Sequence, residues 1–222
     1  MRHPHLEEVR HFWFEDACTS PASLARHQAR WFAPSDQLDR DIEKRFGALP
    51  EAVRSGALSY RPDDAHDLLT VILILDQIPR QIYRNTPRAF AYDSEARAIS
   101  STMIEKSLFQ VLHPVEQVFV FLPFEHSETL SDQSLCVELY ETLLQQAPRP
   151  YQSFLENALD YARRHYSIIK RFGRFPHRNA ILNRGTNREE DGFLLAGGDT
   201  FGVASENTLV QENNVLKTRA RC

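Results

Sequence analysis

The sequence predicts an all-α protein of roughly eight to ten helices, packed as a bundle or an array of helical hairpins. Apolar residues recur at the spacing of one helix face in nearly every segment, and no run alternates apolar and polar residues as a strand does. The connections are short, which favours antiparallel neighbours. With 222 residues, of which 42% are hydrophobic, the chain can bury one sizeable core.

The first quarter of the chain is expected to hold three helices, at residues 5–17, 20–32 and 36–56. Each carries apolar residues three or four positions apart, so each is expected to bury one face. Ser20 followed by Pro21 is typical of an N-cap and a first helical residue, and Gly56 is typical of a helix end.

Segment 63–83 is the most apolar of the chain and is expected to be the central buried helix. Its β-branched residues would also suit a strand, but its polar start and its length favour a helix. Pro79 lacks the N–H that the helical hydrogen-bond ladder needs. This predicts a kink with free carbonyl groups near Asp76.

Five further helices are predicted, at residues 86–106, 113–124, 131–147, 151–173 and 186–198. Pro123 is expected to end the second of these and Gly173 the fourth. Thr186, with Glu189 three residues on, predicts a capping box for the last.

A composition change after residue 198 sets the expected domain organisation. Residues 1–198 are predicted to form a single all-α domain, and 199–222 a polar tail that is extended or partly disordered. A net charge of -4 gives no basic field for nucleic acid or a membrane surface. The longest apolar run, Leu68–Leu75, is too short to cross a bilayer, and the opening residues lack an apolar signal segment, so a cytoplasmic protein is expected.

Arginine dominates the basic residues, since only four of the 26 are lysine. Its planar guanidinium suits bidentate binding of carboxylate or phosphate, although a GC-rich genome would give the same bias. The three cysteines are too widely spaced for a disulfide framework or a Cys-type zinc site.

The first of three polar clusters, LDQIPRQIYR, places Asp76, Gln77 and Arg80 at the end of the most apolar segment. Asp76 and Arg80 are four residues apart and can pair on one helix face. Asp76 could act as an acid or base, with Gln77 and Arg80 binding substrate. Alternatively, the trio is a buried ion pair and cap that only fixes the kink.

The second cluster, FLPFEHSETLSDQ, holds Glu125, His126 and Glu128. An imidazole between two carboxylates is expected to have its charged form favoured, which suits acid–base catalysis near neutral pH. The alternative is that the polar residues here only cap the following helix.

The third cluster, RFGRFPHRNAILNRGT, sets Arg174, His177, Arg178 and Asn179 among two phenylalanines and a proline. The aromatic residues are expected to anchor the turn, so that the arginines can bind an anion, His177 can transfer a proton and Asn179 can orient a carbonyl. Alternatively, the arginines tie this loop to internal carboxylates.

No cofactor and no metal are predicted. The chain lacks the glycine-rich phosphate loops of nucleotide-binding proteins. Its histidines and acids, including His126, His177 and Asp76, match no zinc or calcium spacing.

The stretches VRHFWFED, LDQIPRQIYRNTPRAFAYD, FLPFEHSE and FGRFPHRNAILNRGT resemble the signatures of a bacterial family of proteins of unknown function with a TPR-like all-α fold. The resemblance covers about residues 9–201. It departs at Ile78 and Gln81, where the family reads nearer LDQFPRN, and at Asn183, where it reads ILGR. The resemblance implies a TPR-like fold for this chain, and TPR-like folds usually bind peptides, although a fold does not settle function.

Three hypotheses follow from the clusters. In the first, they converge on a pocket where the arginines hold a small carboxylate or phosphate and His126 or His177 transfers a proton, in hydrolysis, elimination, isomerisation or condensation. In the second, a TPR-like groove captures an acidic peptide. In the third, the arginines are fully paired with internal acids and no cavity exists.

Overall fold

The computed structural model describes residues 3–202, which fold entirely into helices and connecting loops. The α-helices are α1 Pro4–Phe14, α2 Pro21–Phe32, α3 Asp36–Phe46, α4 Leu49–Arg54, α5 Ala65–Ile72, α6 Ile78–Ile82, α7 Asp93–Glu105, α8 Pro114–Glu125, α9 Leu130–Gln146, α10 Gln152–Phe172 and α11 Arg188–Leu195. The all-α prediction is confirmed, and nine helices of the described region have at least eight residues. No helix within it is both long and apolar enough to span a bilayer.

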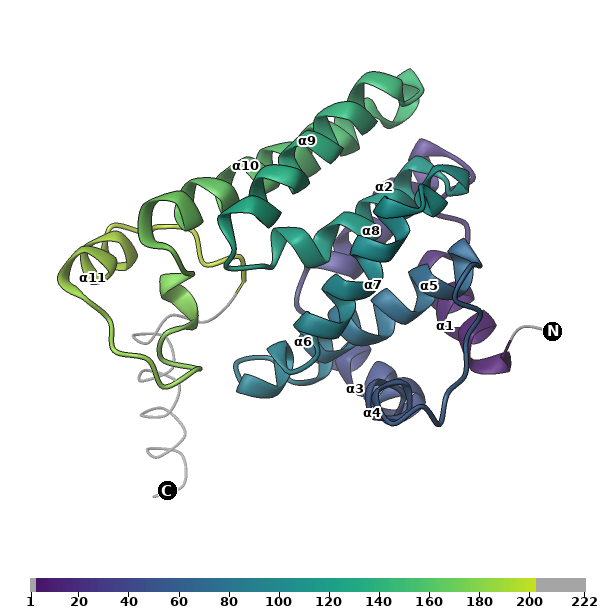
Figure 1. The fold of residues 1–222 in the computed structure, drawn as a ribbon, viewed down its shortest axis with the longest axis horizontal. Helices are drawn as coiled ribbons and strands as arrows, with labels where there is room; N and C mark the ends of the chain where they lie inside the picture. Colours follow the sequence, from purple (N-terminus) through teal and green to yellow (C-terminus); the bar gives the residue numbers. More distant parts are fainter. Residues whose placement is uncertain (1–2, 203–222) are drawn as a thin grey trace.

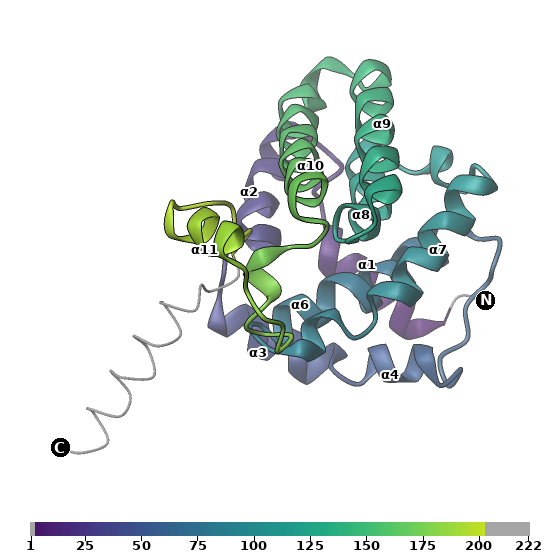
Figure 2. The same ribbon diagram turned by 60° about the vertical axis from the view of Figure 1, so that its left-hand side comes forward.

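Helices α8, α9 and α10 pack in sequence order, and α9 and α10 form a long antiparallel hairpin to one side of the earlier helices (Figure 1). Helix α5 makes contacts with helices that are far from it in the sequence, because it packs against α1 and α8 as well as α7. Figure 2 shows α11 and the loop before it on the α6 side of this hairpin. The TPR-like arrangement stays a prediction.

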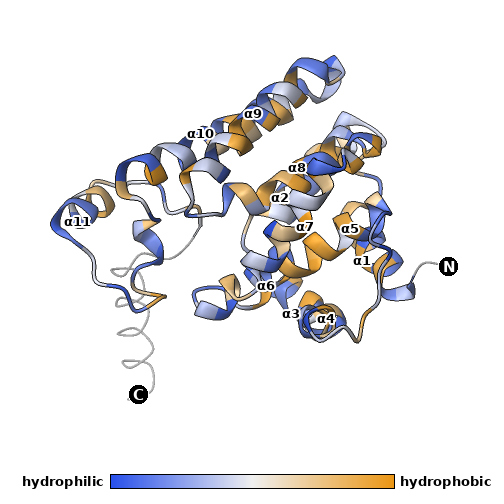
Figure 3. Ribbon diagram, viewed as in Figure 1, coloured by the Kyte–Doolittle hydropathy of each residue, from blue (hydrophilic) through white to orange (hydrophobic). Residues whose placement is uncertain are grey.

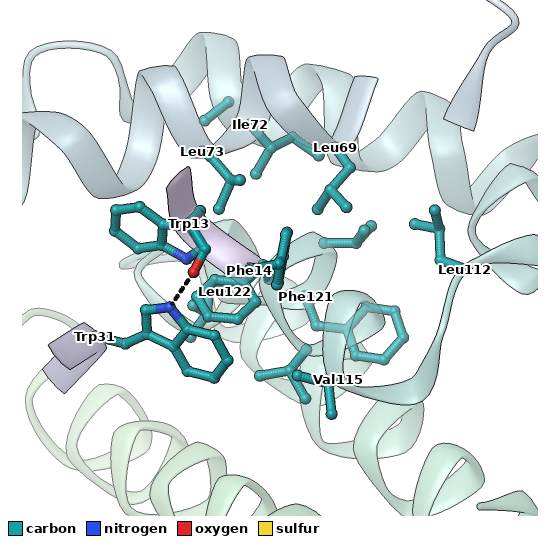
Figure 4. Packing of buried hydrophobic residues seen from close by; sticks show 14 of the residues in the cluster. Trp13, Phe14, Trp31, Leu69, Ile72, Leu73, Leu112, Val115, Phe121 and Leu122 are labelled. Atoms are coloured by element: carbon teal, nitrogen blue, oxygen red, sulfur yellow. Dashed lines mark hydrogen bonds between the residues drawn. The ribbon is translucent and has the colours of Figure 1, made fainter. Parts of the chain in front are cut away.

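The main core forms where α5, α7 and α8 meet, and α5 and α8 are the most apolar of these three helices (Figure 3). Trp13 and Phe14 of α1 lie opposite Ile72 at its centre (Figure 4). Trp31 Nε1 donates a hydrogen bond to the carbonyl oxygen of Trp13 at 2.9 Å, which joins α2 to α1 within this apolar setting. Burial of large aromatic side chains is the main stabilising contribution here.

The predicted central helix forms, but its interruption is a π-helical turn, Leu73–Gln77, between α5 and α6. Pro79 has no N–H to offer, and the Ile78 N–H bonds instead to the Leu73 carbonyl five residues back. The Asp76 carbonyl accepts a hydrogen bond from Arg80 Nη1 at 2.8 Å. The π turn therefore places Asp76 and Arg80 together at the end of the buried helix.

Several predicted helix boundaries are wrong. The helix predicted at 36–56 divides into α3 and α4, and the one predicted at 86–106 begins with a separate 3₁₀ turn, Pro87–Phe90. Helix α8 continues through Pro123 to Glu125, because proline only removes one bond and the surrounding packing holds the last turn. Helix α11 is capped by Asn187 and not by Thr186, since Asn187 Oδ1 accepts from the N–H groups of Glu189 and Glu190. By contrast, Ser20 caps α2 and Gly173 ends α10 in the left-handed conformation, as expected.

A second, smaller apolar cluster forms at the end of α10, where Ile168, Ile169 and Phe175 are buried. Phe201, two residues beyond Asp199, packs against this cluster, and Arg164 of α10 donates to both carboxylate oxygens of Asp199. Residues 199–202 of the predicted tail thus lie against α10. The remainder, 203–222, is outside the described residues.

Candidate functional site

A cavity of about 120 Å³ lies near the end of the π turn, with Arg80 in its lining. Its walls come from three regions: α6 and the chain after it, the end of α8, and the segment from α10 to the end of the described chain. The lining residues are Arg80, Arg84, Asn85, Ala89, Phe90, His126, His165, His177, Arg178, Phe201 and Gly202. Parts of all three predicted clusters therefore meet at one cavity.

A buried carboxylate–imidazole pair forms one side of the site. Asp76 is fully buried, and its Oδ1 lies 2.8 Å from His126 Nδ1. An ionised carboxylate can only accept, so Nδ1 carries the proton and Nε2 is left with a free lone pair. No hydrogen bond to Nε2 exists among residues 3–202, and His126 lines the cavity. This leaves a nitrogen able to take a proton from a bound molecule.

Arg80 and Gln77 keep Asp76 ionised. Gln77 Nε2 donates to Asp76 Oδ2 at 2.6 Å, and Arg80 Nη1 lies 3.1 Å from Asp76 Oδ1. Burial opposes ionisation, but Arg80 and His126 outweigh it, and the pKa of Asp76 lies below its usual range. Arg80 also forms a two-point ion pair with Asp93, at 2.8 and 2.9 Å. Its charge is thus shared between two carboxylates.

His126 is neutral at physiological pH. Burial and the neighbouring Arg80 lower the pKa of its imidazole, and Asp76 only partly offsets them. The expectation of a favoured imidazolium is wrong for this reason. A neutral imidazole oriented by a carboxylate through Nδ1 is the arrangement of a general base.

Arg178 is a buried cation without a carboxylate partner in the described chain. Its Nη1 donates to the His126 carbonyl oxygen at 3.0 Å, while its Nε has no hydrogen-bond partner among residues 3–202. Burial and the nearby Arg80 lower the pKa of Arg178 to about 10, so it stays charged at neutral pH. The rings of Phe175 and Phe90 lie 4.3 and 4.7 Å from its guanidinium carbon. Such cation–π contacts contribute about 0.5–2 kcal/mol, less than a buried, unpaired charge costs.

Two further histidines line the cavity. His165 Nδ1 lies 2.9 Å from the carbonyl oxygen of Tyr161, and burial holds its pKa well below the usual value. His177 Nδ1 is buried without a partner among the described residues, and burial with the charge of Arg178 lowers its pKa to about 3. Both imidazoles are therefore neutral and can exchange hydrogen bonds with a ligand.

Glu125 lies behind this wall and does not line the cavity. Its Oε1 is 3.3 Å from His165 Nδ1, and burial, together with repulsion from Asp76, raises its pKa to about 8. Glu125 is thus predominantly protonated at neutral pH, next to the ionised Asp76.

The other predicted residues, Glu128, Arg174 and Asn179, join Arg184 and Glu190 in a separate group, the loop brace. Arg174 Nε and Nη2 donate to the buried Glu190 at 2.5 and 2.8 Å. Asn179 Nδ2 donates to Glu190, and its Oδ1 accepts from Arg184. Glu128 accepts from Arg184 at 2.7 and 2.9 Å and from the Phe175 N–H. None of these five side chains lines the cavity, and each holds the loop between α10 and α11 in place.

The donor set of the described chain does not fit a metal. No group of three His, Cys, Asp or Glu residues within 3–202 is arranged to hold a metal ion. Among the cavity histidines, Phe201 contacts both His165 and His177, and His126 meets His165 edge-on with ring centroids 6.4 Å apart.

Residues 9–198 match the family described as "Bacterial protein of unknown function (DUF924)". The chain belongs to the DUF924 family. A solved structure described as a protein of unknown function, ATU0120 from Agrobacterium tumefaciens, is similar to it, with a TM-score of 0.68 and 29% sequence identity over 82% of this chain and 98% of that one. A search of curated proteins gave no match.

For this DUF924 member, sequence patterns missed several residues of the cavity. His165 lies within a long amphipathic helix and Phe90 within the 3₁₀ turn Pro87–Phe90, where neither has a distinguishing neighbour. Arg184 lies in the quoted third cluster, but nothing in its spacing shows that it binds Glu128. Phe201 lies beyond the matched residues 9–198.

Proposed function

We propose that the cavity binds a small anion at Arg178 and that His126 acts on it as a general base. The observation that carries this proposal is the buried guanidinium of Arg178, which has no carboxylate partner within residues 3–202 and is hydrogen-bonded to the backbone of His126. An unpaired buried charge costs several kcal/mol, and a bound carboxylate or phosphate would remove that cost.

Proximity supports acid–base chemistry at the bound molecule. The bond from Arg178 Nη1 to the His126 backbone carbonyl, 3.0 Å, ties the anion-binding group to the residue whose imidazole lines the same cavity. Asp76 orients that imidazole and stabilises the imidazolium that forms when Nε2 takes a proton. The proton would come from the ligand itself or from a water held beside it. The described lining holds no Ser, Cys or Lys to act as a nucleophile.

The size of the cavity favours a small molecule over a peptide. About 120 Å³ suits a few non-hydrogen atoms, far below the pockets that enclose drug-sized ligands. A purely structural network would pair every arginine with a carboxylate. Arg174 is paired in this way, but Arg178 is not.

The test is a thermal-shift titration with acetate and inorganic phosphate, with chloride at matched ionic strength as the reference. Wild type is expected to be stabilised by at least one of the two anions through binding to the folded state. Arg178→Met should lose the shift, and Arg174→Met, four residues away in the same loop, should keep it. A shift that survives in Arg178→Met, or no shift above chloride, would contradict the proposal.

A further inference from the structure

One wall of the cavity is the ring of Phe201, which comes from outside the residues that match the family. The ring stacks on His165 with a centroid distance of 3.5 Å and an interplanar angle of 14°. It meets His177 edge-on at 5.7 Å and Phe175 at 6.5 Å. Phe201 therefore contacts two of the three cavity histidines.

The chain after α11 is shaped to bring this ring to the cavity. Gly197 has φ 79°, a conformation that glycine adopts without strain, and turns the chain back after the helix. A Cβ on Gly198 would come within 2.5 Å of the Phe193 ring, so any other residue there would have to displace that ring. Asp199 is then held by Arg164, at 2.8 Å from Nε. These contacts fix the path of residues 197–199, directly before Phe201.

Phe201 also occupies an unfavourable backbone conformation. Its φ of 51° lies in the left-handed region, which is uncommon for a bulky side chain. Such strain persists where surrounding contacts outweigh it, and these positions cluster at ligand sites. Here the ring stacking on His165 and the Arg164 guanidinium, 5.7 Å from the ring, supply those contacts.

We propose that Phe201 is a specificity-determining residue that limits the length of the anion the cavity accepts. This inference rests on the proposed function, since it assumes that the anionic group binds Arg178. With the charged end at Arg178, the rest of the ligand must fit against Phe90 and Phe201, the two phenylalanines of the lining. The ligand class is therefore a small monocarboxylate with a short apolar part, and removal of the Phe201 ring opens room for a longer one.

The experiment measures dissociation constants for straight-chain carboxylates from acetate to hexanoate, by calorimetry on the full chain. Wild type is expected to bind acetate or propionate best. In Phe201→Ala the optimum should move to a longer chain, because each newly buried methylene strengthens binding about fourfold. The ratio of the hexanoate to the acetate dissociation constant should fall at least tenfold. Phe201→Trp should shift the optimum in the opposite direction or abolish binding of butyrate and longer acids.

Phe172→Ala is the matched control. Phe172 belongs to the same small apolar cluster and packs on Phe193 at 5.1 Å, but it does not line the cavity. It should lose comparable packing and keep the wild-type chain-length preference. An unchanged preference in both Phe201 variants, with acetate binding still dependent on Arg178, overturns the role of Phe201 and leaves the proposed function standing. Absence of Arg178-dependent binding in wild type and Phe201→Ala overturns both.

Discussion

Two groups of arginines, one in the loop brace and one at the cavity, differ in how their charges are satisfied. In the loop brace, Arg174 and Arg184 are each paired with a carboxylate, Glu190 and Glu128. At the cavity, Arg80 is shared between Asp76 and Asp93, while Arg178 meets only a carbonyl oxygen and two aromatic rings. Similar residue types thus build a closed network in one place and an unsatisfied cation in the other.

The loop backbone produces this difference. Arg174 follows Gly173, whose left-handed conformation turns the chain toward α11 and Glu190. Arg178 ends the 3₁₀ turn Pro176–Arg178, which directs it toward the end of α8. Four residues of sequence therefore separate a structural arginine from a candidate ligand-binding one. The comparison can be tested by removing charges from each group in turn.

Asp76→Ala should have the largest effect on stability. The fully buried carboxylate accepts from Gln77, Arg80 and His126, and its loss leaves Arg80 and His126 without their buried partner. We expect the free energy of unfolding in urea to fall by about 3–5 kcal/mol. Asp39→Ala, which breaks the partly exposed pair with Arg84, should cost about 1 kcal/mol. Equal losses of unfolding free energy in the two variants would show that the interactions of Asp76 with Arg80 and His126 contribute no more than an ordinary surface ion pair.

Glu190→Ala should have the second-largest effect on stability and should leave the cavity able to bind acetate. Arg174, Asn179 and the Asn187 N–H all donate to this buried carboxylate. Arg174 can turn to solvent, so we expect a loss of about 2–3 kcal/mol in urea unfolding. Binding of acetate should persist at a temperature where the variant is folded. Loss of binding in a folded Glu190→Ala protein would mean that the loop brace belongs to the site.

In wild type, the free energy of unfolding should fall as the pH rises from 6.5 to 8, and Glu125→Gln should remove that fall. Burial and repulsion from Asp76 raise the pKa of Glu125 from 4.5 to about 8. Between these values the folded chain holds a proton that the unfolded chain has released, so stability falls as the pH rises. The lowered pKa values of His165 and His177 have the opposite effect, but only below 6.5.

Between pH 6.5 and 8, wild type should therefore lose about 1–2 kcal/mol more than Glu125→Gln, measured by urea unfolding at each pH. Parallel curves for the two proteins would show instead that Glu125 is ionised in the folded chain beside Asp76.

Arg178→Met should have the smallest effect in the absence of ligand. The substitution removes one hydrogen bond and a buried unpaired charge, and these changes oppose each other. We expect the free energy of unfolding to stay within about 1 kcal/mol of wild type. Arg174→Met should lose about 2 kcal/mol, because it leaves Glu190 buried without its cation. A larger loss in Arg178→Met than in Arg174→Met would reverse the comparison.

Local patterns predicted the helices because apolar spacing and capping residues act within a few positions. They also selected Asp76, Arg80, His126, His177 and Arg178, since charge in an apolar setting must be paired or functional. They did not separate these from Glu128, Arg174 and Asn179, because pairing depends on Glu190 and Arg184, which tertiary folding brings in. His165 and Phe201 were missed for the same reason. Pro79 signalled an interrupted helix, but the π turn depends on how the core holds Leu73 and Ile78.

The most direct test of the central claim is an NMR pH titration of the His126 imidazole, assigned by comparison with His126→Gln, with and without saturating acetate. An anion held by Arg178 lies beside His126 and favours its charged form, so the pKa of His126 should rise when acetate is added. The rise should be absent in Arg178→Met and present in Arg174→Met. An unchanged pKa of His126 in wild type at saturating acetate, or an equal rise in Arg178→Met, would contradict the proposed site.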